Sequence, residues 1–417
     1  MGRRVDSDRA DVAIVGAGAA GLAATIFAGR AHPNRSIVLL DGARKPGAKI
    51  LVSGGSRCNV TNVRVTEHDF WGGRSTIVRR VLRAFPVADT VEFFREIGVR
   101  LHEEQNGKLF PDSNRSRDVL DALLRETARV GAALRADHRV TDVTRDADGF
   151  RLITSRGDLH ADRVVLATGG QSLPKTGSDG AGLAIARRLG HTIVDTTPAL
   201  APLLLSEDAA IHRRLSGVSQ DVELSIWIGG AIATRLRGAL LWTHFGASGP
   251  VALDASRHWL RAEVEGRHAT MTVNFCGGRA FDRIGEEWAR AAARHPRTSA
   301  QSLMSDYVPV SVAAALLAVL DIDGAVALAH LNKNNRRRIV HALVEWPLAV
   351  TGTRGYNFAE ATAGGVDLGE IDPATMESRL VDGLYLVGEM LDVDGRIGGF
   401  NFQWAWSTGF VAGRAVV

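Results

Sequence analysis

The segment from residue 11 to residue 41 constrains the fold of this chain most strongly. A short apolar run at 11–15 leads directly into a Gly-Ala-Gly-Ala-Ala-Gly turn at 16–21, and an alanine- and leucine-rich segment follows. A second apolar run at 37–40 ends on Asp41. This order predicts a strand, a tight glycine turn, a helix and a second strand, which is the arrangement that binds a dinucleotide.

Each glycine of the turn has a distinct expected role. Gly16 permits the tight turn, Gly18 lets a pyrophosphate approach the backbone, and Gly21 lets the helix pack closely on the strand. The helix N-terminus then faces the phosphates. Asp41 is placed to accept hydrogen bonds from a ribose diol, so a 2′-phosphate is disfavoured there. The alternative is a glycine turn without a ligand. The candidate cofactor-binding residues of this segment are Gly16, Ala17, Gly18, Ala19, Ala20, Gly21, Asp41 and Gly42.

The composition is that of an ordinary globular protein and disfavours several function classes. A chain of 417 residues predicts two or three domains, and its 50 basic and 46 acidic side chains leave a formal charge of only +4. The densest basic cluster, Arg336–Arg338, is interpreted as a solvated helix face, so no nucleic-acid partner is expected. With two cysteines, no evident signal segment and no long apolar run, we expect a cytoplasmic protein without a metal site or a membrane partner.

Residues 42–63 are predicted to form a loop rich in glycine, serine and asparagine. Its hydroxyl, amide and cationic groups suit a polar, anionic ligand. The loop follows Asp41 directly, which favours a role at the same site over the alternative of a solvated loop. The candidate cofactor-binding residues here are Lys49, Ser53, Gly54, Gly55, Arg57, Cys58, Asn59 and Thr61.

A small three-strand meander is predicted from the runs 134–143, 150–155 and 160–167. Its last strand runs into a glycine pair, where the backbone can lie against a flat ring or a phosphate. A helix is expected at 183–189, and the alternative is the strand and helix of a plain α/β fold. Val140, Ala167, Thr168, Gly169 and Gly170 are counted among the cofactor-binding residues.

The C-terminal part repeats the pattern of a buried strand followed by glycine and an acid. The run 384–387 ends in Gly-Glu, and a glycine-rich loop at 395–401 opens a last helix, expected at 403–412. An acid in this place can bond ribitol hydroxyls, and a helix N-terminus can stabilise negative charge on a reduced flavin. The candidates here are Gly388, Glu389, Gly398, Gly399, Phe400 and Asn401.

A change of composition near residue 196 indicates an inserted domain. Short β-type runs come first, and alanine-rich helical segments follow. We therefore expect 1–195 and 346–417 to form the two parts of an FAD-binding domain. The insert between them, 196–345, is expected to be β-rich at 196–278 and helical at 279–341.

At this level of detail the sequence resembles the BaiN/RdsA-like family of NAD(P)/FAD-dependent oxidoreductases. The motifs that carry the resemblance span nearly the whole chain: 16–21, 53–62, 167–170, 174–178, 243–246, 248–250, 351–355, 362–366, 388–389 and 398–406. A more distant likeness is to fumarate reductase flavoproteins. Departures are Asp41 where the family often has Glu, Ser56 where a third glycine is usual, and Arg396-Ile397 where Pro-Thr is common.

The resemblance implies an α/β fold, with a two-part Rossmann-like FAD-binding domain, an inserted β-barrel-like domain and a helical subdomain. It also implies non-covalent FAD and reduction of a small organic substrate, such as one with an activated C=C bond. Since the chain has no second strand–GxGxxG–helix unit, NAD(P)H is expected to be a transient reductant. Cys58 has no CxxC partner, which disfavours a disulfide-reductase mechanism.

Catalytic candidates are chosen from loops expected to face the cofactor. A reductase of this type needs a proton donor and a cation that polarises a carbonyl. We expect His244 and Arg354 in these roles, with Tyr356 as a second donor. Each residue also has an alternative structural role: His244 could stabilise a turn, Arg354 could be a surface or ion-paired arginine, and Tyr356 could be a core aromatic residue. Two other functions stay open: an FAD-dependent enzyme that modifies nucleic acid such as tRNA, and a flavin-binding sensor without turnover.

Overall fold

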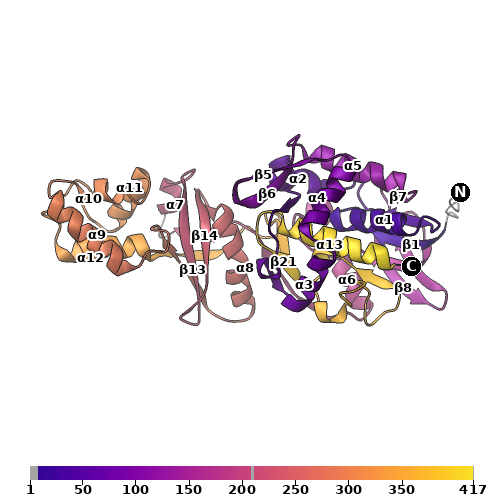
Figure 1. The fold of residues 1–417 in the computed structure, drawn as a ribbon. Helices are drawn as coiled ribbons and strands as arrows, with labels where there is room; N and C mark the ends of the chain where they lie inside the picture. The colour runs from indigo at the N-terminus through magenta and orange to yellow at the C-terminus, as the bar shows by residue number, and fades with distance from the viewer. Residues whose placement is uncertain (1–7, 208–210, 417) are drawn as a thin grey trace. The chain divides into compact units, whose positions relative to one another are not determined.

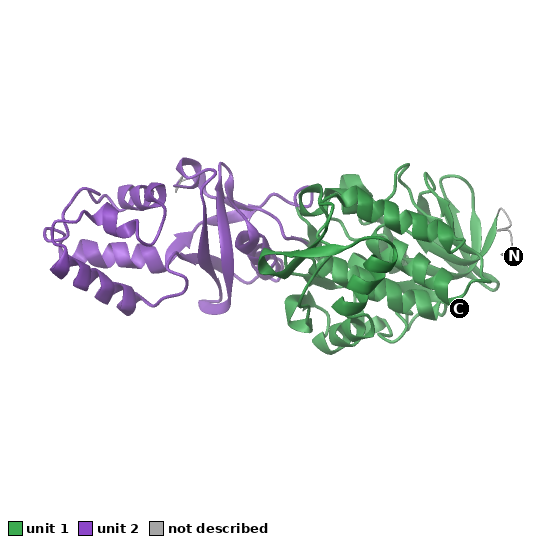
Figure 2. Ribbon diagram, turned by 45° about the horizontal axis from the view of Figure 1, so that its top comes forward, with its two compact units in different colours: residues 1–197, 359–417 green, residues 198–358 purple. Residues whose placement is uncertain are grey.

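The computed structural model describes residues 8–207 and 211–416 of the chain. The chain divides into two compact units, shown in Figure 2: Met1–Thr197 with Ala359–Val417 form unit 1, and Pro198–Phe358 form unit 2. The expected domain boundaries at 195/196 and 345/346 stay predictions. The chain ends that were assigned to the FAD-binding domain, 1–7 and 417, lie outside the described residues. Among the described residues, no helix is long and apolar enough to cross a membrane.

The main sheet of unit 1 has seven strands and unites the two parts of the chain that form this unit. The strands are β1 (Arg9–Val15), β2 (Ile37–Leu40), β7 (Ala133–Arg135), β8 (Val140–Asp146), β9 (Gly149–Thr154), β10 (Leu159–Leu166) and β20 (Leu384–Leu386). They follow the order β7-β2-β1-β10-β9-β8, and β20 pairs with β10. The pairs among β7, β2, β1, β10 and β20 are parallel, whereas β10-β9-β8 is antiparallel. Buried, apolar β1 and β2 fit the centre of a parallel sheet.

Two long helices pack against each other beside this sheet, α1 (Ala19–Ala31) and α13 (Phe400–Ala415), as Figure 1 shows. Glycines make the close approach possible. A Cβ at Gly409 would lie 2.7 Å from the Ala20 carbonyl oxygen, and one at Gly413 would lie 2.6 Å from that of Ala24. The N-terminal helix and the C-terminal helix therefore share one interface.

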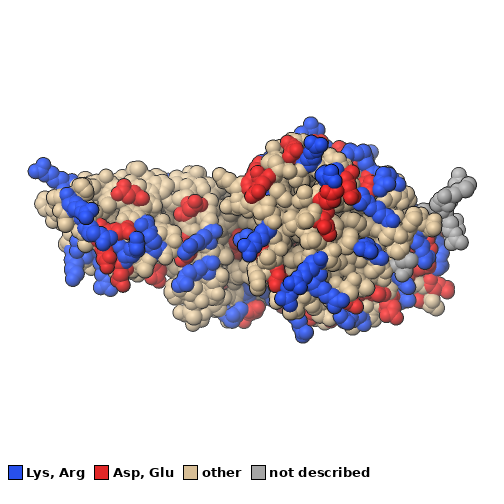
Figure 3. Space-filling model, in the orientation of Figure 1, with Lys and Arg blue, Asp and Glu red and all other residues tan. Residues whose placement is uncertain are grey.

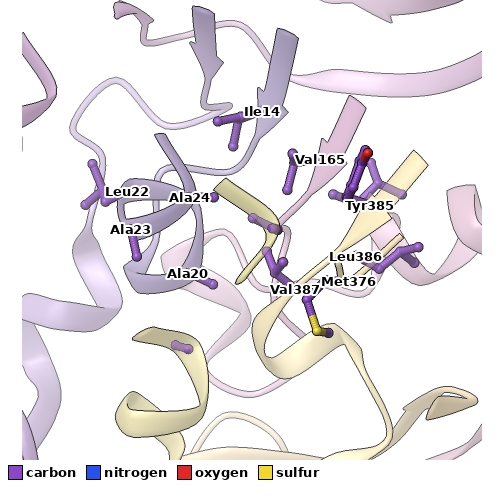
Figure 4. Close-up of a cluster of buried hydrophobic side chains, with 14 of the residues drawn as sticks. Ile14, Ala20, Leu22, Ala23, Ala24, Val165, Met376, Tyr385, Leu386 and Val387 are labelled. Atoms are coloured by element: carbon purple, nitrogen blue, oxygen red, sulfur yellow. The ribbon is translucent and has the colours of Figure 1, made fainter. Parts of the chain in front are cut away.

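The core of unit 1 lies where the sheet meets these helices (Figure 4). Ile14 of β1, Val165 of β10 and Leu386 of β20 are fully buried, together with Ala23 and Ala24 of α1. Short alanine side chains leave room for the larger residues of the strands to pack closely. This packing fixes the carboxyl ends of β1, β10 and β20 relative to the start of α1.

The other elements of unit 1 surround this framework. The helices are α2 (Ala48–Ser56), α3 (Ser75–Ala84), α4 (Val87–Glu96), α5 (Ser116–Arg129) and α6 (Ala181–Arg188). The small sheets are β3 (Thr61–Asn62) with β6 (Lys108–Pro111) and β5 (Leu101–Glu104), β4 (Phe70–Gly72) with β21 (Val393–Gly395), and β11 (Ile193–Ala199) with β19 (Ala361–Val366).

Two local expectations for unit 1 are wrong. The segment 42–63 is not all loop, because α2 begins at Ala48, although its residues Ser53, Gly54 and Gly55 are not helical. The run 134–143 is not one strand of a meander. It divides into β7, which joins β2, and β8, which joins β9, because the left-handed residue Asp137 turns the chain between them.

Unit 2 contains a second seven-stranded sheet that curls on itself. Its strands, in sheet order, are β17 (Trp346–Leu348), β16 (Ala269–Asn274), β13 (Ser219–Ile228), β14 (Ala231–Thr243), β15 (Gly246–Ser248), β12 (Leu203–Leu205) and β18 (Val350–Thr353). The two edge strands, β17 and β18, are separated by the single residue Ala349, so the edges of the sheet meet there. This geometry is barrel-like.

Helices complete unit 2: α7 (Ile211–Arg214), α8 (Pro250–Val264), α9 (Phe281–Arg294), α10 (Ala300–Met304), α11 (Val310–Val319) and α12 (Lys333–Val344). Four of them, α9 to α12, form a helical segment with its own buried residues, among them Ile284, Trp288 and Leu316. Residues 238–243 continue strand β14, and the turn to β15 follows them. The predicted α/β class, with a Rossmann-type sheet and extra antiparallel sheets, is confirmed.

Candidate functional site

The glycine turn of unit 1 connects β1 to α1 and leaves one open position. Gly16 has φ of +104°, and a Cβ there would lie 2.5 Å from the Ala167 carbonyl oxygen. A Cβ at Gly21 would lie 1.8 Å from the Gly16 carbonyl oxygen. A Cβ at Gly18 would meet no atom within 4 Å. Gly16 and Gly21 are therefore needed for packing, whereas the space over Gly18 is free for a ligand.

Asp41, at the end of β2, holds the glycine turn in place. Its carboxylate accepts hydrogen bonds from the backbone N–H groups of Ala17 and Ala43, each at 2.7 Å. Each oxygen keeps a lone pair that can accept a further bond, for example from a ribose hydroxyl. Asp41 therefore has a structural role that the sequence did not indicate, in addition to the predicted one.

Gly42 and Val140 lie beside Asp41. The backbone N–H of His138 donates to the carbonyl oxygen of Asp41 at 2.8 Å. A Cβ at Gly42 would lie 3.1 Å from the Arg139 Cβ. Val140 follows Arg139 in the chain, begins β8 and is buried. The structure thus brings these predicted residues to the same end of the sheet as the glycine turn.

A polar network joins Lys49 to the C-terminal part of unit 1. The Lys49 ammonium donates to the Glu389 carboxylate and to the Ser172 hydroxyl. The Ser172 hydroxyl lies 2.6 Å from Glu389 Oε1, which also accepts the backbone N–H of Thr362 at 3.0 Å. Sequence analysis named Lys49 and Glu389 as cofactor-binding residues but not Ser172 or Thr362, although Thr362 begins the family motif at 362–366.

The segment from the non-helical end of α2 to Asn59 is tightly turned and contains a buried polar atom without a hydrogen-bond partner. Gly54 and Gly55 have positive φ, as does Cys58 at +62°. The backbone N–H of Cys58 donates to the Ser53 carbonyl oxygen at 3.1 Å. Asn59 is buried, and its Oδ1 has no hydrogen-bond partner. A buried amide oxygen without a donor is costly, so this loop is suited to a ligand that supplies one.

Cys58 is a protonated thiol. The residue is fully buried, and this desolvation raises its pKa to about 12, although a hydrogen bond with Ser53 opposes the shift. A thiol in this state is a poor nucleophile. Burial of the Cys58 thiol is a second argument against a disulfide-reductase mechanism, beside the missing CxxC partner.

Arg57 and Thr61 bond to protein groups. The Arg57 guanidinium pairs with Glu104 at 2.6 Å and lies 4.1 Å from the centre of the Phe110 ring. The Thr61 hydroxyl donates to Gln403 Oε1 at 2.7 Å and so links the loop to α13. These contacts account for both side chains structurally, and a role at the cofactor stays a prediction.

The Ala167–Gly170 segment follows β10 and turns beside the glycine turn. Ala167 donates its N–H to the Val15 carbonyl oxygen at 2.8 Å. The Thr168 hydroxyl lies 3.9 Å from the Met390 sulfur. A Cβ at Gly169 would lie 2.4 Å from the Ser178 hydroxyl, and one at Gly170 would lie 2.4 Å from that of Thr362. These glycines are therefore required by close packing.

The C-terminal glycine loop leads into α13. Gly399 has φ of +94°, and a Cβ there would lie 2.5 Å from the Thr61 backbone. The Gly398 carbonyl oxygen accepts from the Asn62 amide at 3.2 Å. Asn401 braces the loop through two 2.8 Å bonds to the Gly395 backbone, and the Phe400 side chain is buried. A Cβ at Gly388 would lie 2.7 Å from that of Ala20, which places the Gly388–Glu389 turn at the start of α1.

The residues of unit 1 fit a flavin dinucleotide on three structural observations. Helices α1 and α13 both begin without a side-chain cap and without an acid in the first turn, so their N-terminal N–H groups can bind anionic oxygens. The space over Gly18 is open, and Asn59 has an unpaired buried oxygen. Two helix N-termini on helices packed side by side can serve the pyrophosphate and the ring of one ligand.

Glu360 is a further polar residue of unit 1 that sequence analysis did not select. It precedes β19, and its carbonyl oxygen lies 3.4 Å from the Ser172 hydroxyl. Solvent reaches the residue, yet desolvation by surrounding protein raises the pKa of its carboxyl, with Lys108 and Lys49 opposing part of the shift. A carboxyl with a raised pKa can hold a proton nearer neutral pH.

The three catalytic candidates all belong to unit 2, whereas the predicted cofactor-binding residues all belong to unit 1. His244 is exposed in the turn between β14 and β15, and its ring lies 5.1 Å from that of Phe245. The Arg354 guanidinium lies 4.6 Å from the Phe245 ring and 3.4 Å from the Phe358 ring. His244 and Arg354 thus flank one aromatic residue, and Tyr356 lies in the turn that follows.

Comparison with known proteins agrees with this geometry. The profile of the HI0933-like protein Rossmann domain matches residues 10–415. A 3-dehydro-bile acid delta(4,6)-reductase of Clostridium scindens is 32% identical over 404 residues, covering 97% of this chain and 98% of the relative. A ribosomal RNA dihydrouridine synthase of Escherichia coli is 32% identical over 411 residues, covering 98% of each chain.

Solved structures share the fold at lower identity. A quinol fumarate reductase FrdA chain of E. coli has a TM-score of 0.51 at 17% identity, covering 97% of this chain and 69% of that chain. A Mycobacterium smegmatis Sdh1 complex has a TM-score of 0.51 at 15% identity, covering 98% and 68%. The predicted likeness to fumarate reductase flavoproteins is thus confirmed at the level of fold. With a profile match over nearly the whole length, the chain belongs to the HI0933-like Rossmann family, the BaiN/RdsA-like group of flavoprotein oxidoreductases.

Proposed function

We propose that this protein is an FAD-dependent reductase of a C=C bond conjugated to a carbonyl group. The observation that carries the proposal is the pair of uncapped helix N-termini, α1 and α13, on helices that pack side by side in unit 1. Together with the open space over Gly18, they provide backbone donors for one dinucleotide. We expect the FAD to be held without a covalent bond.

The names of the two relatives support this reaction type. One name describes reduction of a 4,6-diene in a 3-oxo compound, and the other describes saturation of the uracil ring of uridine. The 5,6 double bond of uracil is conjugated to its C4 carbonyl, as the 4,6-diene is to the C3 carbonyl. Both named reactions therefore add a hydride and a proton across an electron-poor C=C bond, and we assign the same reaction type to this chain.

The residues of unit 1 are assigned to cofactor binding. The turn at 16–21 would hold the pyrophosphate, and Asp41 would accept bonds from the ribose. Lys49 and Glu389, paired with each other, would orient the ribityl and ring end. When bound and reduced, FAD supplies the hydride equivalent for the reaction. The N-terminus of α13 would stabilise negative charge at that end of the site.

The protein itself must supply a proton and polarise the carbonyl. Arg354 is assigned to the carbonyl oxygen, since a guanidinium stays charged at any relevant pH. His244 is assigned as proton donor, with Tyr356 as a second donor. Glu360 is an added candidate, because its raised pKa keeps it protonated at higher pH than an ordinary carboxyl. NAD(P)H is proposed as a reductant that binds transiently, since the sequence has no second glycine-turn unit for it.

Anaerobic mixing tests the proposal. Protein reconstituted with FAD is mixed with NADH or NADPH, and the yellow absorbance is followed. A steroid dienone, a uridine-containing RNA, a quinone or oxygen is then added. We expect bleaching by NAD(P)H, followed by recovery of colour with a conjugated C=C substrate. Recovery with quinone or oxygen alone, and with no conjugated substrate, would contradict the assignment.

Variants test the roles of the side chains. We expect His244→Ala, Arg354→Ala and Glu360→Gln to slow the reoxidation step, by about 100-fold or more for the true proton donor, while leaving FAD bound. The matched controls are His268→Ala, Arg214→Ala and Glu103→Gln, all at exposed positions. If Glu360 is the proton donor, the wild-type rate should fall at high pH, where this carboxyl loses its proton. The raised pKa of Glu360 moves that fall to a higher pH than an ordinary carboxyl would give. Glu360→Gln should therefore remove that alkaline limb.

A further inference from the structure

One end of the helical segment in unit 2 concentrates basic side chains, and we propose that it docks RNA. The surface, named here the basic end, consists of Arg294, Arg297, Lys333, Arg336 and Arg337. The inference rests on the proposed reduction of a conjugated C=C bond and adds the surface of this chain that would hold the phosphate backbone of a structured RNA.

Helix packing brings these residues together although they come from distant parts of the sequence. Helices α9 and α12 are antiparallel, because Phe281 at the start of α9 lies 6.4 Å, ring to ring, from His341 near the end of α12. At the other end, the Pro296 carbonyl oxygen accepts the N–H of Ala329 at 3.0 Å. The end of α9 and the start of α12 therefore lie at the same end of the helix pair.

A second hydrogen bond supports the same arrangement. The backbone N–H of Leu328 donates to the Thr298 carbonyl oxygen at 2.9 Å. Arg297 lies between Pro296 and Thr298, and Lys333 begins α12 a few residues after Leu328. The sequence analysis interpreted Arg336–Arg338 in isolation. The fold adds the basic residues of a second segment to the same end.

The charges of the basic end are not neutralised within the described part of the chain. Elsewhere in the segment basic residues are paired: Arg283 and Arg290 with Glu287 and Glu286, at 3.5 and 3.6 Å. Arg338 donates to the Leu320 carbonyl oxygen at 2.7 Å. In contrast, none of the five residues of the basic end has an ion-pair partner among the residues that the structure describes.

The surface is accessible and electrostatically suited to phosphate. Arg294, Arg297, Lys333 and Arg337 are exposed, and Arg336 is half-buried. Figure 3 shows Lys and Arg side chains gathered over the helical segment, with fewer Asp and Glu side chains between them. The N-terminus of α12 adds its positive dipole end to the same charge. Four arginines can bind phosphate oxygens in bidentate fashion.

The chemistry of the surface favours RNA over a lipid membrane. A helix that lies on a membrane needs large apolar side chains next to its basic ones. The exposed large apolar residues described in unit 2 are Val264, Val310, Val319 and Phe358, and none belongs to α9 or α12. A basic surface without such residues fits the phosphate backbone of a polynucleotide.

Binding of the FAD-loaded full-length protein to RNA tests the inference without turnover. The probe is a fluorescein-labelled stem–loop RNA with uridines in its loop, titrated at several salt concentrations. The test variant carries Arg294→Gln, Arg297→Gln, Arg336→Gln and Arg337→Gln. The control carries Arg80→Gln, Arg83→Gln, Arg117→Gln and Arg125→Gln, four exposed arginines of unit 1 with the same total charge change.

We expect the test variant to bind RNA at least about tenfold more weakly than the control. The slope of the logarithm of its binding constant against the logarithm of salt concentration should be smaller in magnitude by about one for each arginine that no longer binds a phosphate. Equal weakening in both variants, or no RNA binding by the wild type, would overturn the inference. So would tighter binding to vesicles of anionic phospholipid than to the RNA. FAD binding and bleaching of the flavin by NAD(P)H are measured in the same preparations. Because these two steps need no RNA, their failure would count against the proposed function alone.

Discussion

Half-buried Glu370 and buried His191 and Ser378 form a polar chain in unit 1 that fixes the loop after β19. The His191 Nδ1 lies 2.8 Å from Glu370 Oε2, and its Nε2 lies 2.9 Å from the Ser378 hydroxyl. Ser378 also accepts the backbone N–H groups of Leu380 and Val381 at 3.0 Å. The arrangement resembles a catalytic triad in order, but the serine is buried and its oxygen is occupied, so its role is structural.

A pH-dependent loss of stability is expected from Glu370. Burial alone would raise the pKa of Glu370, but hydrogen bonds from Thr192 and His191 lower it below the ordinary value. A carboxyl with a lowered folded-state pKa stabilises the fold at pH values above its unfolded-state pKa. That stability is lost as the pH falls through the folded-state pKa.

We therefore expect Glu370→Gln to lower the free energy of unfolding by about 1–2 kcal/mol at pH 7, and by less near pH 4. Urea unfolding at the two pH values measures the difference. Glu103→Gln, at an exposed position, is the control and should show no such pH dependence. An equal effect of Glu370→Gln at both pH values would refute this account of the residue.

The two cysteines should resist modification in the native protein. Burial raises the pKa of Cys58 to about 12 and that of Cys276 to about 11. At pH 8 the thiolate fraction of Cys58 is then about one in ten thousand. We expect iodoacetamide to leave both residues unmodified in the folded state and to alkylate both in urea, as measured by mass spectrometry. Rapid alkylation of native Cys58 would show that it is accessible and ionised.

At the scale of elements, the contact between α1 and α13 depends on glycines that leave no room for a side chain. A Cβ at Gly413 would lie 2.6 Å from the Ala24 carbonyl oxygen and 2.9 Å from the Ala28 nitrogen. These are backbone atoms of a buried helix, so they cannot move aside cheaply. Gly285 of α9 is also helical, but a Cβ there meets nothing within 4 Å.

The same substitution should therefore have opposite effects at the two glycines. We expect Gly413→Ala to destabilise unit 1 by about 1–3 kcal/mol. Gly285→Ala should be neutral or stabilise unit 2 by up to about 1 kcal/mol, because alanine favours a helix over glycine. Thermal unfolding of both variants provides the comparison. A neutral Gly413→Ala would mean that the two helices do not pack as closely as described.

Elements whose constraints are local were predictable from the sequence, and contacts between distant segments were not. The turn at 16–21 was predictable because its three glycines, the strand before them and the helix after them lie within one short stretch of sequence. The first turn of α2 was missed because glycines and serines dominate the surrounding segment. Lys49 lies 123 residues from Ser172 and 340 from Glu389, and no local pattern indicates that the three meet.

At the scale of the whole molecule, the chain divides its candidate functions between two units. Unit 1 contains the predicted cofactor-binding residues, and unit 2 contains His244, Arg354 and Tyr356 together with the basic end. Sequence analysis could assign residues to the cofactor because the glycine motifs are specific. It could not foresee the basic end, because the end of α9 and the start of α12 come to the same end of the helix pair only when the two helices pack antiparallel.

The central claim is that the backbone at 16–21 holds the pyrophosphate of FAD, and Gly18 allows folding and binding to be tested separately. A side chain at Gly18 enters open space and its φ of −82° suits any residue, so Gly18→Val should cost folding no more than about 1 kcal/mol. Gly21→Val would instead clash with the Gly16 carbonyl oxygen and disrupt the fold.

The most direct measurement is the dissociation constant of FAD for the wild type and for Gly18→Val, by fluorescence titration, with the melting temperature of each apoprotein. We expect the wild type to bind FAD and Gly18→Val to bind it about 100-fold more weakly, which is roughly 2.8 kcal/mol, with a nearly unchanged melting temperature. Equal affinity in the two proteins, or no binding of FAD by the wild type, would contradict the claim.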